Sequence, residues 1–129
     1  MNRYFLAASA LAMVVGLAHT VLGERLIFRR LRTDGVIPTD GGNLLAERHI
    51  RILWATWHLA TVFGWGIAAL LWWLALPSSR PATQSPAPWV IAGAMFAASV
   101  LVLVGTQARH PGWVGLLAVA ILTAVGTLR

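Results

Sequence analysis

The sequence predicts an all-α integral membrane protein, a four-helix bundle that crosses the bilayer up-down-up-down as a single transmembrane domain of residues 1–129. Four apolar segments carry this prediction, at about 4–22, 52–76, 89–106 and 113–128. Each approaches or exceeds the ~20 helical residues that cross a bilayer core of ~30 Å. No Asp, Glu, Lys or Arg falls inside these segments, and the hydrophobic share of 58% exceeds the usage of soluble domains.

Composition excludes several classes of function. The chain has no cysteine, so disulfides, Cys-ligated metals, iron–sulfur clusters and thiol redox chemistry are excluded. Its net charge of +6 comes from arginines that flank the apolar segments, where we expect them to set topology and to meet anionic lipid headgroups. No basic patch is interleaved with aromatic residues in a soluble module, so we expect no nucleic-acid partner.

The arginines also predict the orientation of the chain. If four segments cross the bilayer, three arginines fall on one side and seven on the other, and the side with seven is expected to be cytoplasmic. Both termini then lie outside a bacterial inner membrane, and the loop of residues 24–51 is cytoplasmic. The first segment is expected to stay uncleaved, because no Ala-x-Ala site follows it. The seven arginines are Arg25, Arg29, Arg30, Arg32, Arg48, Arg51 and Arg109.

The connections between the segments carry local signals. Residues 25–32 alternate basic and apolar side chains, which predicts an amphipathic, interfacial extension of the first helix. Asn43 is a suitable N-cap for a helix that begins at Leu44 and runs to Leu76. The Pro- and Ser-rich stretch 77–88 predicts an outer loop, and the turn at 109–112 predicts that the last two helices form an antiparallel hairpin.

Two histidines fall inside the apolar segments and define the candidate site. His19 lies five residues before Glu24, ~7.5 Å along a helix, and His58 lies seven residues after Arg51, ~10.5 Å. Because the first two helices are expected to be antiparallel, both imidazoles should lie at nearly one depth below the cytoplasmic surface. Ionisable groups within membrane helices are costly and often mark functional sites.

A polar and aromatic stripe of the second helix adds to this site. Glu47, Arg51, Trp54 and His58 follow one another at spacings of four, three and four residues, so they share one helix face. With His19, Glu24 and His110 from the same predicted side, they form a polar His/Glu/Arg cluster. His19 and His58 are the candidate cofactor ligands, and a metal ion would add Glu24 to them.

Each of these residues also has a purely structural interpretation. A neutral histidine between helices can hydrogen-bond a carbonyl or a threonine. Glu24 is expected to form interfacial ion pairs with Arg25 and Arg29, and Glu47 with Arg51, and each such pair contributes little. His110 would be a solvated turn residue, and Ser99 would hydrogen-bond within its own helix. The coincidence of depth is what favours a functional site over this interpretation.

The stretch from His19 to Glu24, His-Thr-Val-Leu-Gly-Glu, and the later pair Trp57-His58 carry a family resemblance. The chain resembles a group of small, uncharacterised bacterial inner-membrane proteins that have four spans, an H-x-x-L-G-E element and a later W-H. The likeness covers the first two spans and implies a location and no known activity. The small multidrug-resistance exporters share only the size, since their first span carries a membrane-embedded glutamate that is absent here.

Three functions therefore stay open. The first is an accessory or interaction subunit, without enzymatic activity, that binds a membrane-protein partner or a second copy of the chain. The second is a binder of b-type haem or a metal ion through His19 and His58. The third is a proton-linked small-molecule transporter that uses both histidines and Glu24. An enzyme is the least favoured class, since four histidines are too few for a histidine-rich di-iron site.

Overall fold

A computed structural model describes residues 1–129, except for the side chain of Arg80. Every regular element in the described chain is helical, which confirms the all-α prediction. Two of the short helices, η2 and α3, lie within the predicted outer loop. In chain order the elements are α1 (Arg3–Leu26), η1 (Phe28–Leu31), α2 (Glu47–Ala75), η2 (Pro77–Ser79), α3 (Arg80–Thr83), α4 (Ala87–Gly105) and α5 (Gly112–Leu128).

Three of these helices are long and apolar enough to cross a membrane: α1 continued through η1, α2 and α4. The fourth apolar helix, α5, has 17 residues. At 1.5 Å per residue it is about 26 Å long, which is at the lower limit for a membrane span. The four helices closely follow the four apolar segments predicted from the sequence, because hydropathy over a window of this length is a strong local signal.

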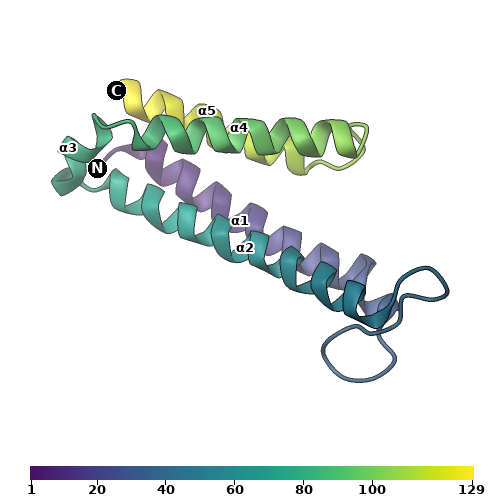
Figure 1. Ribbon diagram of the computed structural model, residues 1–129. Helices are drawn as coiled ribbons and strands as arrows, with labels where there is room; N and C mark the ends of the chain where they lie inside the picture. Colours follow the sequence, from purple (N-terminus) through teal and green to yellow (C-terminus); the bar gives the residue numbers. More distant parts are fainter. The chain divides into compact units, whose positions relative to one another are not determined.

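The helices form two compact units. The first contains residues 1–15 and 64–129, so it holds the start of α1, the end of α2, and all of α4 and α5. Within it α4 and α5 lie side by side and antiparallel, as predicted for the final hairpin (Figure 1). Its core contains both small and large apolar side chains, among them Phe5, Ala8, Ala12, Ala68, Leu71, Leu74, Ile91 and Val119.

Two serines in this unit join neighbouring helices by hydrogen bonds. Ser9 Oγ donates a hydrogen bond of 2.7 Å to the carbonyl of Ala68, which links α1 to α2. Ser99 Oγ donates to the carbonyl of Trp113 over 2.7 Å and so links α4 to α5. The expectation that Ser99 bonds within its own helix is therefore wrong, because the hairpin brings the Trp113 carbonyl within its reach, and this oxygen has a second lone pair besides the one used within α5.

The start of α1 is capped by Asn2. Its Oδ1 accepts hydrogen bonds from the backbone N–H groups of Tyr4 and Phe5, at 3.0 and 3.4 Å. Its Nδ2 donates to the carbonyl of Gly126 over 2.7 Å, which ties the cap to the end of α5. One side chain thus satisfies orphan amides of α1 and fastens the last helix to the first.

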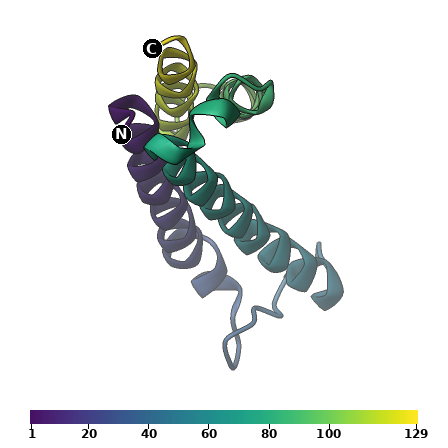
Figure 2. The same cartoon turned by 90° about the vertical axis from the view of Figure 1, so that its left-hand side faces the viewer.

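The second unit contains residues 16–63, the second half of α1, η1, the following loop and the first half of α2. The two half-helices run antiparallel and are joined by the loop (Figures 1 and 2). The predicted helical extension at 25–32 is present as far as Leu31, but it is not α-helical throughout. The α-helix ends at Leu26, and η1 follows with Phe28 buried and Arg29 and Arg30 exposed.

The second long helix begins three residues later than predicted, at Glu47 instead of Leu44. Residues 42–44 form a turn in which Gly42 has a positive φ of 59°. Asp40 Oδ1 accepts the Gly42 N–H at 2.9 Å, and the Gly41 carbonyl accepts the Leu45 N–H at 3.2 Å. This turn has its own hydrogen bonds, so Asn43 does not cap α2.

Candidate functional site

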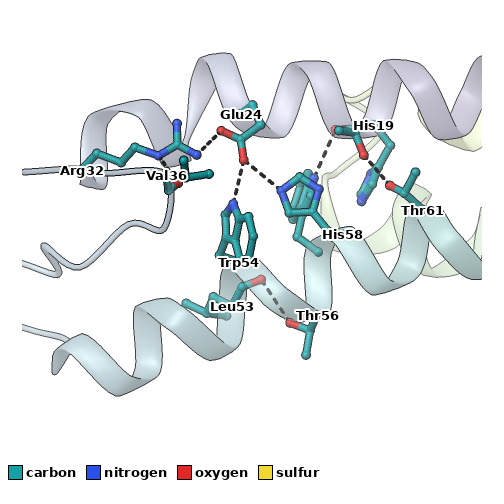
Figure 3. A network of polar contacts seen from close by, with 11 residues as sticks. His19, Glu24, Arg32, Val36, Leu53, Trp54, Thr56, His58 and Thr61 are labelled. Atoms are coloured by element: carbon teal, nitrogen blue, oxygen red, sulfur yellow. Dashed lines mark hydrogen bonds and ion pairs between the residues drawn. The ribbon is translucent and has the colours of Figure 1, made fainter. Parts of the chain in front are cut away.

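The centre of the second unit is the carboxylate of Glu24, near the end of α1 (Figure 3). Its Oε1 accepts hydrogen bonds from Trp54 Nε1 at 2.7 Å and from His58 Nε2 at 2.9 Å. Its Oε2 forms an ion pair of 2.5 Å with Arg32 Nη2. We call these four residues the Glu24 cluster. Each of the two carboxylate oxygens therefore has a donor, and the carboxylate side chain is only 26% exposed.

The local structure explains why these residues meet. Trp54 and His58 are four residues apart on α2, so their side chains project from one face and their rings lie 4.7 Å apart. Arg32 follows η1, whose tight turn carries the chain back toward the end of α1. Arg32 Nε also donates to the carbonyl of Val36 over 2.6 Å, so the guanidinium joins the loop to the Glu24 cluster.

A second set of contacts lies beside the Glu24 cluster, between the same two helices. The imidazole of His19 stacks on the indole of Trp57, with ring centroids 4.2 Å apart and planes within 7° of parallel. Trp57 Nε1 donates to the backbone carbonyl of His19 over 3.1 Å. The hydroxyl of Thr20, the residue after His19, and that of Thr61, one turn after Trp57 on α2, share a hydrogen bond of 2.7 Å (Figure 3).

Gly23 makes the close approach of Trp57 possible. A β-carbon at this position would overlap the indole, whose Nε1 and Cε2 atoms occupy that space. The glycine and the glutamate of the H-x-x-L-G-E element therefore contact α2 directly, and the histidine stacks on it. The motif and the later Trp-His pair are two halves of one helix–helix contact.

Several predicted site residues lie apart from this contact. Glu47 and Arg51 form an ion pair of 2.6 Å at the start of α2, with about half of each side chain exposed. His110 lies in the turn before α5, in the first unit, where its Nδ1 accepts the backbone N–H of Gly112 at 3.0 Å. The structure thus gathers His19, Glu24, Trp54 and His58 and leaves the other candidates in local contacts.

The sequence prediction did not include two residues that take part in these contacts, Arg32 and Trp57. The expected partners of Glu24 were Arg25 and Arg29, one and five residues away, but its ion pair is with Arg32. The prediction treated 25–32 as helix, and the break after Leu26 moves every later side chain to a different direction. The adjacency of Trp57 to His58 and the glycine before Glu24 were the available signals for the stacked pair.

Binding of haem or a metal ion to His19 and His58 would depend on which ring nitrogen atoms can act as ligands. A haem iron bound by His19 and His58 would take one nitrogen from each ring. The Nε2 atom of His58 is engaged by Glu24, so His58 would bind iron either through Nδ1 or, once that hydrogen bond breaks, through Nε2. Within the described residues, no three His, Asp or Glu side chains come together as a metal site.

Comparison of the chain with protein-family models, curated proteins and solved structures finds no match in any of the three. The resemblance to small four-span bacterial proteins remains a prediction that rests on the H-x-x-L-G-E element and the Trp-His pair.

Proposed function

We propose that this chain is a four-span inner-membrane protein that serves as an accessory or interaction subunit. Its helices would cross the bilayer up-down-up-down as a bundle, with both termini outside and the loop of residues 24–51 in the cytoplasm. The lengths and composition of the four apolar helices support the spans. The excess of arginine in that loop and at Arg109 supports the orientation.

The observation that carries the subunit proposal is the closed set of contacts at Glu24. Each of its two oxygens has a donor from the chain itself, and the three donors come from α2 and from the segment after η1. A carboxylate held in this way joins two helices and a loop, and has little left with which to bind a substrate. Its role is then to hold the loop in a fixed form.

The loop that it holds exposes apolar side chains where we expect water. Val36 is 74% exposed and Leu44 is 93% exposed, and both lie outside the apolar segments. Strongly exposed apolar side chains on a polar loop favour contact with another protein. We therefore propose that a membrane-protein partner, or a second copy of the chain, docks on the loop of residues 33–46.

Site-specific photocrosslinking in cells tests this proposal. A photoreactive residue at Val36 or Leu44 is expected to give one and the same crosslinked protein product, because both positions face the partner. The control position is Leu101, 74% exposed on the apolar helix α4, where lipid is expected to be the neighbour. The Glu24→Gln variant should weaken the loop crosslinks. Absence of a protein crosslink from both loop positions would overturn the proposal.

A second candidate is a proton-linked transporter, and the contact between His58 and Glu24 is the observation that favours it. An imidazole and a carboxylate joined by a hydrogen bond of 2.9 Å can share and exchange a proton. Proton-driven uptake of a substrate should then be abolished by both His58→Gln and Glu24→Gln. Uptake that is indifferent to both variants would leave the subunit proposal as the better account.

The haem or metal reading is the third and least supported candidate. It is tested by the absorption spectrum and elemental analysis of protein purified in mild detergent. Stoichiometric haem or metal that is lost in both the His19→Ala and the His58→Ala variants would favour it over the subunit proposal. Protein without a haem absorption band after supplementation, and without metal, would remove it.

A further inference from the structure

A groove of about 390 Å³ opens on the second unit beside the stacked pair of His19 and Trp57. This volume lies within the range of about 300–1,000 Å³ that is common for small-molecule sites. Its lining is mainly apolar, and no carboxylate is among the described residues that line it. The apolar side chains come from two short stretches, Ile27, Phe28 and Leu31 around η1, and Leu53, Trp57 and Ala60 on α2.

The groove faces outward rather than into the protein. Ile27 is 40% exposed and Leu53 is 49% exposed, and Ala60 is exposed as well. On α2 the lining residues follow one another at spacings of about four and three, so they form one stripe along about 10 Å of helix. An apolar stripe of this kind on a membrane helix is in contact with acyl chains when the helix spans the bilayer.

Two exposed arginines belong to the short helix η1, which supplies part of the lining of this groove. Arg29 and Arg30 stand between Phe28 and Leu31 in η1, and both are exposed. On α2, His49 is one turn before Leu53 on the same stripe, so it continues the stripe beyond the apolar end. The groove is thus apolar, and two exposed guanidinium groups are carried by the same short helix whose Phe28 and Leu31 line it.

These arginines are not used in the ion pairs of the unit. Among the described side chains, the ion pairs between arginine and glutamate join Arg32 with Glu24 and Arg51 with Glu47. Arg25, Arg29 and Arg30 are exposed and take part in neither pair. Clusters of basic residues just outside a membrane helix attract anionic headgroups, by about 1 kcal/mol for each Lys or Arg near the surface.

We propose that the groove is a binding site for one anionic phospholipid. The acyl chain lies along Leu53, Trp57 and Ala60, and the phosphate lies against Arg29 and Arg30. Because η1 follows the end of α1, where the first apolar segment gives way to basic residues, a headgroup held there lies at the bilayer surface. This inference needs only that α1 and α2 cross a bilayer, and it does not depend on the subunit function proposed above.

The charge distribution favours an anionic lipid over a zwitterionic one. A phosphatidylcholine headgroup would bring a quaternary ammonium close to two guanidinium groups, and no described lining residue could neutralise it. A phosphatidylglycerol headgroup carries a net negative charge and hydroxyl groups, which suit arginine donors. The selectivity between these two lipids is therefore the property to measure.

The test uses the full chain in mild detergent and compares phosphatidylglycerol with phosphatidylcholine of identical acyl chains, by native mass spectrometry. Phosphatidylglycerol is expected to bind more tightly. The double variant R29Q/R30Q should lower its affinity by about 25-fold, the equivalent of two surface arginines. The matched control is R109Q, in the turn before α5, which should leave the affinity unchanged.

The groove itself is tested by filling it. A60F places a ring in the groove and should lower phosphatidylglycerol affinity, whereas A69F, at another exposed position of α2, should not. Both are surface positions, and circular dichroism checks that the helices persist. Equal affinity for the two lipids, an A60F variant that binds normally, or full competition by glycerol phosphate alone would each overturn the proposal.

Discussion

Trp57 occupies the space that a side chain at position 23 would need. The indole of α2 lies over Gly23 of α1, and it also donates its N–H to the carbonyl of His19 over 3.1 Å. The absence of a β-carbon therefore sets how closely the second halves of these helices approach. This contact leads to the first of four predictions.

We expect Gly23→Ala to lower the free energy of unfolding by about 1–3 kcal/mol, the usual cost of overpacking a fitted contact. The matched control is Gly64→Ala on α2, where a β-carbon would meet nothing within 4 Å. That variant should be neutral or stabilising by up to about 1 kcal/mol, because alanine is the better helix former. Unfolding by a denaturing detergent, followed by circular dichroism, measures both. Equal effects of the two substitutions would contradict the overlap with Trp57.

The two glutamates that form ion pairs should differ in their contribution to stability. Glu24→Ala leaves the N–H donors of Trp54, His58 and Arg32 without their acceptor, and should cost about 1.5–3 kcal/mol. Glu47→Ala removes an exposed pair with Arg51 and should cost less than about 1 kcal/mol. The same unfolding assay compares them. A larger loss for Glu47→Ala would refute the central place that we give to Glu24.

Arg32 should control the order of the loop that follows it. Its Nε holds the Val36 carbonyl at 2.6 Å, and the amides of Thr39 and Asp40 both donate to the carbonyl of Leu31. Arg32→Gln is expected to speed hydrogen exchange in residues 33–41, measured by mass spectrometry. Arg30→Gln, a change of the same chemistry two residues away, should leave exchange at the wild-type rate. Equal exchange in the two variants would show that the guanidinium of Arg32 does not hold the loop.

Asn2 and Asn43 both lie near the start of a helix, but only Asn2 caps one, so their substitutions should differ in their effect on stability. Asn2→Ala should cost about 1–2 kcal/mol, because it removes the cap of α1 and the hydrogen bond to the Gly126 carbonyl. Asn43→Ala should cost less than about 0.5 kcal/mol, since α2 begins only at Glu47. Thermal unfolding in detergent distinguishes these outcomes. A comparable loss at Asn43 would restore its role as a cap.

The error at Asn43 shows what kind of inference the sequence supports. Asparagine is a favoured N-cap residue, so the local pattern predicts a helix that begins at Leu44. The glycine at position 42, with its φ of 59°, and the hydrogen bonds of Asp40 and Gly41 hold an alternative turn there. The segment could form either an N-cap at Asn43 or a separate turn. The hydrogen bonds of Asp40 and Gly41, which lie outside the N-cap motif, favour the turn.

The candidate site also combines a feature that the sequence predicts with contacts that only the structure shows. The expectation that His19 and His58 share one depth rests on helical rise alone. In the structure both rings lie between α1 and α2 (Figure 3). Their partners do not follow from it. His58 binds Glu24, whereas His19 stacks on Trp57, so the two imidazoles have separate contacts instead of facing one ligand.

The sequence by itself determined the number, length and apolar character of the long helices, because hydropathy and helical periodicity are properties of adjacent residues. Only the tertiary structure decided that Glu24 pairs with Arg32 and that Gly23 receives Trp57. These contacts depend on where α1 stops and on how far α2 is rotated about its axis. Both are set by the packing of the two helices and the loop as a whole, so no local pattern encodes them.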